Sequence, residues 1–224
     1  MTDDQGRIRP GHTPERVGFF TDAVFAIAMT LLVIEIPRPE GDEAFSVGDG
    51  VSKAAAARHL WDFFIAQTGS FVAYLLAFFM LWTAWRQHHR LFDRLDRLSP
   101  GLVGWHFPLL LLIGFLPYPT TVYGHHTDNP AAALLFVLSF GGLLIARSGV
   151  QSQALRDNLL RTPADAAEVR TGARASWIVA GYWLASVLLC WWTPWVIVAW
   201  VLTPVIGFAL ARGDRRRDTS IGSG

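Results

Sequence analysis

Six apolar stretches account for most of this 224-residue chain, and each has close to the ~20 residues that a helix needs to cross a bilayer. Open strands leave backbone polar groups without partners in lipid, so we expect all six stretches to be helices. They cover residues 17–37, 60–85, 102–123, 131–149, 174–192 and 195–212. The sequence therefore predicts an all-α integral membrane protein with a single six-helix domain over residues 1–224.

The charged residues predict how this domain lies in the membrane. Charged side chains make up only 17% of the chain and hydrophobic ones 52%, which excludes an ordinary soluble domain. With the N-terminus inside, all but three of the 19 Lys and Arg residues fall in inner segments, the exceptions being Arg38, Lys53 and Arg58. This asymmetry predicts a multi-pass protein of the cell membrane with both termini cytoplasmic. We expect the lipid bilayer as a partner and no nucleic acid.

Several expected helices begin with a capping residue followed by proline. These pairs are Thr13-Pro14, Asn129-Pro130 and Thr193-Pro194. Thr162-Pro163, with Asp165 following, predicts a short soluble helix between the fourth and fifth spans. Residues 38–59 form either a short outer helix or a linker.

The first stretch keeps two carboxylates, Asp22 near its inner end and Glu35 near its outer end. Ionisable groups in a membrane are costly, so a helix that retains them is expected to face protein or water on that side. Glu35 belongs at the outer mouth, where it either attracts cations towards an axis or is a solvated helix end beside Arg38.

Asp22 has two possible roles, a polar network that ties the first helix to the second, or direct contact with an ion. We favour the network, because polar groups at that depth need partners. Its expected members, all at the cytoplasmic level, are Arg16, Thr21, Asp22, Trp85, His88 and His89.

Metal binding and enzymatic catalysis find little support in the sequence. Adjacent residues on a helix point about 100° apart, so His88 and His89 do not form a pair of metal ligands. Neither a nucleophile–base pair nor a set of metal ligands occurs at a standard spacing. We therefore expect no metal, no cofactor and no enzyme. Cys190 is the single cysteine, so no intrachain disulfide is possible.

Three motifs carry a resemblance to a known family. The string FFTDAVFAIAMTLLVIEI (19–36), with Arg16 before it, resembles the opening helix of the transmembrane protein 175 family of lysosomal potassium channels and their prokaryotic relatives. Its Thr21 stands where the family usually has Ser. WRQHHRLF (85–92) and GFLPYPTTVYG (114–124) are similar to two further family motifs. One departure is GWHFP (104–108), where the family pattern has a polar Asn.

The resemblance implies a potassium-permeable channel without a cofactor other than the permeant ion. A chain with one six-helix repeat is implied to form a homotetramer with the first helix around the pore. Carried over by position, Ile27, Leu31 and Ile34 form the hydrophobic constriction, and Thr30 is associated with potassium preference over other monovalent cations. On their spacing alone, the same three apolar residues are more typical of helix packing than of a pore lining.

A proton- or cation-coupled secondary transporter is the alternative function, with Asp22, Glu35 and the histidines as titrating groups. No inverted repeat of broken helices supports it. Thr121-Val122-Tyr123-Gly124 resembles the filter loop of ordinary potassium channels, but it lacks the middle glycine and follows a spanning helix. We therefore expect a channel without a re-entrant selectivity-filter loop, closed at a hydrophobic constriction.

Overall fold

The computed structural model describes residues 13–39, 45–48, 50–192 and 195–203, which are mostly helical. This described part contains no β-strand and only two isolated β-bridges. Its helices are α1 (Pro14–Ile34), α2 (Lys53–Ala66), α3 (Thr68–Phe92), α4 (Pro100–Phe115), α5 (Pro117–His125), α6 (Pro130–Arg156), α7 (Pro163–Ala185) and the 3-10 turn η2 (Ser186–Leu189). The all-α prediction is confirmed.

Four segments are long and apolar enough to cross a membrane, namely α1, α3, the successive helices α4 and α5, and α6. They correspond to the first four predicted stretches. The sixth stretch is helical over residues 195–203, while its remainder and the start at Thr193-Pro194 lie outside the described residues.

The second and third stretches differ from their expected form. Gln67, at φ −90° and ψ 11°, separates α2 from α3, and α3 continues to Phe92 beyond the expected end at residue 85. The third stretch is interrupted after Phe115, because Pro117 and Pro119 cannot donate the backbone hydrogen bonds that would continue α4.

The prediction of a short soluble helix after Thr162 was wrong. The hydroxyl of Thr162 does cap a helix, accepting from the backbone N–H of Asp165 at 3.1 Å. However, that helix runs without interruption for 23 residues to Ala185 and includes the start of the fifth stretch. Neither a proline nor a second cap follows Pro163 within it, so the charged first turns and the apolar later turns form one helix.

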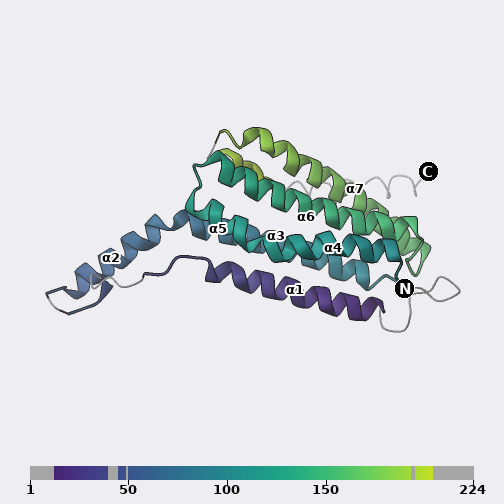
Figure 1. Cartoon of the computed structure of the whole chain (residues 1–224), viewed down its shortest axis with the longest axis horizontal. Coiled ribbons are helices and arrows are strands. Elements are labelled where there is room, and N and C mark those ends of the chain that lie inside the picture. Colours follow the sequence, from purple (N-terminus) through teal and green to yellow (C-terminus); the bar gives the residue numbers. More distant parts are fainter. Residues whose placement is uncertain (1–12, 40–44, 49, 193–194, 204–224) are drawn as a thin grey trace, which may run out of the picture.

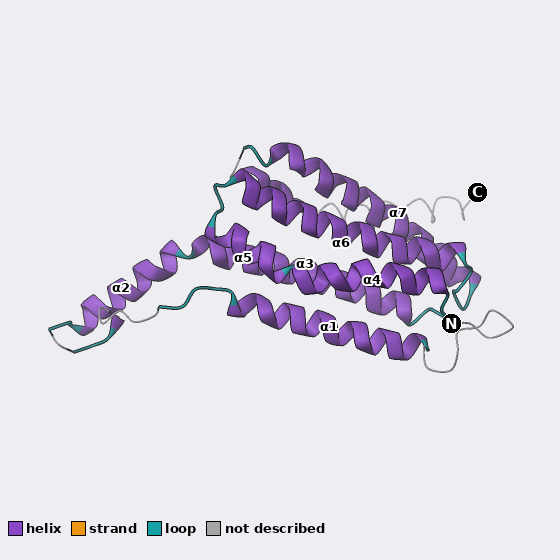
Figure 2. Ribbon diagram, in the orientation of Figure 1, coloured by secondary structure: helices purple, strands orange, loops and turns teal. Residues whose placement is uncertain are grey.

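The helices form an elongated bundle, and α1 lies at one edge of it (Figure 1). α1 packs along α3, α4 and α5, whereas α6 lies between α4 and α7. In the most apolar 18-residue segment of α6, 72% of the residues are buried. α2 extends away from the bundle beyond the end of α1 (Figure 2). One face of α1 is therefore covered by the bundle, and its other face is uncovered.

The start of α1, the end of α3 and the start of α7 meet at one end of the bundle (Figure 1). There the backbone N–H of Arg161 donates to the Arg94 carbonyl at 3.0 Å, and the Arg94 side chain pairs with Glu168 at 2.7 Å. We call this the arginine-rich end, because it includes Arg16, Arg86, Arg90, Arg94, Arg97, Arg156 and Arg161. We call the other end of the bundle the opposite end.

Candidate functional site

α1 has one buried face and one uncovered face. The buried face consists of Gly18, Thr21, Phe25, Ala28 and Leu32. The predicted constriction residues lie on the uncovered face: Ile27 is 59%, Leu31 39% and Ile34 57% exposed. Apolar side chains this exposed on a membrane helix require lipid or another protein chain beside them.

Thr30 lies on the same uncovered face. Its hydroxyl donates to the carbonyl of Ile27 at 2.8 Å, within its own helix. A hydroxyl has one hydrogen and two acceptor lone pairs, so the Thr30 oxygen remains able to accept from water or to contact a cation.

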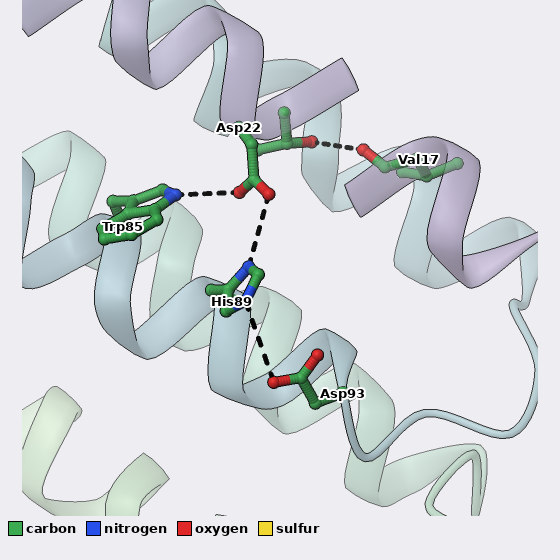
Figure 3. A network of polar contacts seen from close by, with 6 residues as sticks. Val17, Asp22, Trp85, His89 and Asp93 are labelled. Atoms are coloured by element: carbon green, nitrogen blue, oxygen red, sulfur yellow. Dashed lines mark hydrogen bonds and ion pairs between the residues drawn. The ribbon is translucent and has the colours of Figure 1, made fainter. Parts of the chain in front are cut away.

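Asp22 points away from the uncovered face of α1 towards α3, where two side chains hold its carboxylate (Figure 3). Trp85 Nε1 donates to Oδ1 at 2.9 Å, and His89 Nδ1 lies 3.3 Å from Oδ2. A carboxylate can only accept, so this nitrogen of His89 carries a hydrogen. Its other ring nitrogen lies 3.9 Å from Asp93 Oδ2. We call Asp22, Trp85 and His89 the carboxylate clamp.

The other three expected members of the network lie elsewhere. Thr21 is fully buried and donates to the Val17 carbonyl of its own helix at 2.9 Å. His88 points to α4. Arg16 is exposed, and its side chain makes no hydrogen bond or ion pair with the described residues. The structure thus brings Asp22, Trp85 and His89 together and leaves the other three out.

His88 forms a buried contact that the sequence did not predict. It is 2% exposed, and its Nε2 lies 3.1 Å from Nε2 of His106 on α4. His106 Nδ1 lies 2.8 Å from the Leu102 carbonyl and must be its donor, so in a neutral pair His88 donates and His106 accepts. The Phe92 ring stacks on His88 at 4.3 Å between centroids. The signal in the sequence was His106, a lone His in an apolar span and part of the GWHFP stretch (104–108).

Glu35 at the opposite end turns towards α5. The hydroxyl of Thr121 donates to Glu35 Oε2 at 3.1 Å, although both side chains are partly in solvent. The structure shows no ion pair between Glu35 and Arg38 among the described residues. Of the two roles that the sequence left open for Glu35, neither included this contact.

A cavity of about 310 Å³ lies at the arginine-rich end, between the start of α1 and the end of α3. It is lined by Pro14, Glu15, Gly18, Phe19, Asp22, His89, Phe92, Asp93 and Arg161. Within the described part of the chain, no group of three or more His, Cys, Asp or Glu residues is placed to hold a metal ion. The cavity is therefore an opening beside the carboxylate clamp, with side chains of both charges in its wall.

Comparison with known proteins finds a family to which this part of the chain is similar. Residues 16–117, which include most of α1 and the carboxylate clamp, match the family model described as endosomal/lysosomal potassium channel TMEM175. The chain is therefore similar to the TMEM175 family over this range. This confirms the resemblance seen in the three motifs, and the family is one of ion channels rather than enzymes.

Two bacterial relatives of this chain are named potassium channels. One, from Chamaesiphon minutus, is 29% identical over 200 residues, which cover 87% of this chain and 93% of that protein. Another, from Streptomyces collinus, is 29% identical over 147 residues, or 66% of this chain and 65% of that protein.

The fold also matches a solved TMEM175 structure. The crystal structure of a lysosomal potassium-selective channel TMEM175 homologue from Chamaesiphon minutus superposes with a TM-score of 0.69 at 26% identity. The match covers 88% of this chain and 97% of that one. The similarity thus extends across the helices described above.

Proposed function

We propose that this chain is a potassium-permeable cation channel whose pore is lined by α1. The observation that carries the proposal is the division of α1 into two faces. Ile27, Thr30 and Leu31 lie on the uncovered face, while Asp22 is turned into the bundle and held there. The names of the bacterial relatives support potassium as the permeant ion.

In this proposal four copies of the chain surround a central axis, each contributing α1. The side chains of Ile27, Leu31 and Ile34 then form apolar rings, and a narrow apolar ring closes a pore by excluding water without any charged plug. Thr30 contributes an oxygen beside these rings to a partly dehydrated ion. Selectivity arises there rather than in a re-entrant loop.

We also propose six transmembrane helices, with α7 continued by η2 as the fifth and the helix from residue 195 as the sixth. The arginine-rich end is cytoplasmic and both termini are inside, because basic residues are retained on the cytoplasmic side of a membrane. The protein would then lie in a cell membrane as a multi-pass homotetramer.

The carboxylate clamp has a positioning role in this channel. Both oxygens of Asp22 have donors on α3, so the carboxylate is held against the bundle and away from the uncovered face of α1. Its two partners are one helical turn apart on the same helix, which fixes the start of α1 against α3. We propose that the clamp holds α1 in register with the bundle, and that the buried side chains of Thr21 and His88 pack this end of the helix.

Potassium and sodium flux from proteoliposomes tests the proposal. Ile27→Asn and Leu31→Asn place polar side chains in the apolar rings, so we expect higher flux and weaker preference for potassium in at least one variant. Ile178→Asn is the matched control, since Ile178 is 52% exposed on α7, away from α1. The channel proposal would be contradicted if correctly assembled wild-type tetramers gave no potassium flux, or if Ile178→Asn changed the flux as much as Ile27→Asn and Leu31→Asn. Slow, saturable, pH-driven flux unaffected by either change would favour the transporter.

A further inference from the structure

The second long-range polar contact of α1 lies at its opposite end, at a motif to which the proposed function gives no role. Thr121 belongs to the Thr121-Val122-Tyr123-Gly124 segment of α5, and its hydroxyl reaches Glu35, the residue that caps the end of α1. The two residues are 86 positions apart in the chain. Among the described residues of α1 and its caps after Asp22, Glu35 makes the single side-chain hydrogen bond to another helix.

α5 is a firm support for this contact. A Cβ atom added to Gly124 would lie 2.9 Å from the Ser70 Cα, and one added to Gly69 would lie 2.7 Å from the Gly124 carbonyl oxygen. α3 and α5 thus touch through their backbones at this point. The Tyr123 ring also stacks on Phe136 of α6, with 5.5 Å between centroids. The position of Thr121 is therefore set by two other helices.

The last turn of α1 has little other support. Leu32 is its last buried residue, and both Val33 and Ile34 are more than half exposed. A helix end with few buried contacts opens and shifts at low cost in free energy. The hydrogen bond from Thr121 is thus the specific contact that opposes such movement beside Ile34.

The chemistry of the contact predicts which substitution preserves it. Thr121 Oγ1 lies 3.1 Å from Glu35 Oε2 and 3.0 Å from the Pro117 carbonyl, but it has one hydrogen to donate. The carboxylate has no hydrogen to donate, so a hydrogen bond between the two helices requires Thr121 to donate to Glu35. A glutamine amide at position 35 can accept it, or can donate to Oγ1 while Thr121 donates to Pro117. Both arrangements keep the two helices joined.

We propose that the hydrogen bond between Thr121 and Glu35 is a latch that positions the opposite end of the pore helix and thereby sets the pore width at Ile34. The inference rests on the proposed function, since it takes α1 as the pore helix. Thr121 and Glu35 act here as positioning residues, because they hold the helix that carries the constriction.

Single-channel recording and hydrogen exchange on the same variants test the latch. Thr121→Val and Glu35→Ala should change the open-to-closed ratio in the same direction, by about two- to tenfold, as expected for one exposed hydrogen bond. Glu35→Gln should stay within about twofold of the wild type. The double variant should match either single one. Thr83→Val is the control, because Thr83 is half-buried on α3 and its hydroxyl bonds, among the described residues, only to the Phe79 carbonyl of its own helix.

Hydrogen exchange separates failure of the latch from failure of the channel. Amides of residues 31–36 should exchange faster in Thr121→Val and Glu35→Ala than in the wild type, and not in Thr83→Val. Unchanged exchange and gating in Thr121→Val, or additive effects in the double variant, would overturn the latch. If the wild type carries no potassium current, the proposed function fails, and the exchange rates alone decide whether the latch exists.

Discussion

Replacing Trp85 with phenylalanine should destabilise the protein through the loss of one hydrogen bond. The indole packs in tilted contacts against the Trp82 and His89 rings, with ring centroids 4.8 and 5.6 Å away, and a phenyl ring retains much of this contact. What disappears is the Nε1–H that donates to Asp22 at 2.9 Å. The carboxylate is then left with His89 as its donor on α3.

The size of the effect follows from the charge and exposure of Asp22. A hydrogen bond to a charged group contributes about 1.5–3 kcal/mol. Because Asp22 keeps 25% of its side-chain surface in solvent and retains the contact with His89, we expect a loss at or just below the low end of that range, about 1–2 kcal/mol. The matched control is Trp82→Phe, since the Trp82 indole has no hydrogen-bond partner among the described residues.

Denaturant unfolding in detergent micelles, followed by circular dichroism at fixed protein concentration, measures both variants. Trp85→Phe should lose about 1–2 kcal/mol more than Trp82→Phe, and the excess should vanish when Asp22 is replaced by Ala in both. Equal losses in the two tryptophan variants, or an excess that survives without Asp22, would refute the role of the clamp in holding α1.

Two further predictions concern polar groups outside α1. The Arg147 guanidinium is buried without a carboxylate partner in the described part of the chain, and it donates to Gln87 Oε1 at 2.6 Å. In the same unfolding assay, Gln87→Leu should lower the free energy of unfolding by about 3 kcal/mol, because it leaves a buried charge without this acceptor. Arg147→Met removes the charge itself and should lower it much less. The hydroxyl of Ser99 lowers the pKa of the Asp157 carboxyl at the end of α6. A carboxyl with a lowered pKa stabilises the fold at pH values above its unfolded-state pKa of about 4, and this stabilisation is lost as the pH falls through the pKa of the folded state. We therefore expect the melting temperature of Asp157→Asn to fall less than that of the wild type between pH 7 and about pH 3.

Helix placement was accessible to sequence reasoning because it depends on local features. The pairs Thr13-Pro14 and Asn129-Pro130 begin helices as expected, since a side-chain cap and a proline at the first position act within one turn. Hydropathy found the apolar turns but not the helix ends. α3 and α7 continue into charged turns at the arginine-rich end, where polar side chains reach water without breaking the helix.

The contacts between helices were only partly accessible. Asp22 and His89 could be placed at one level of the membrane by counting turns, and the structure brings them together. The rotation of α3 was not predictable in the same way, and it turns the adjacent His88 towards His106 instead. The contact of Glu35 with Thr121 depends on how α5 is oriented after the break at Pro117, which no local pattern specifies.

Chemical modification of a single cysteine at Ile27 tests most directly whether α1 lines the pore. The chain has one cysteine, the buried Cys190, so Cys190→Ser provides a background without thiols. In this background, a small thiol reagent should abolish potassium flux through Ile27→Cys proteoliposomes and leave Ile178→Cys unaffected. Normal flux that persists after treatment of Ile27→Cys, or equal inhibition of both variants, would contradict a pore lined by α1.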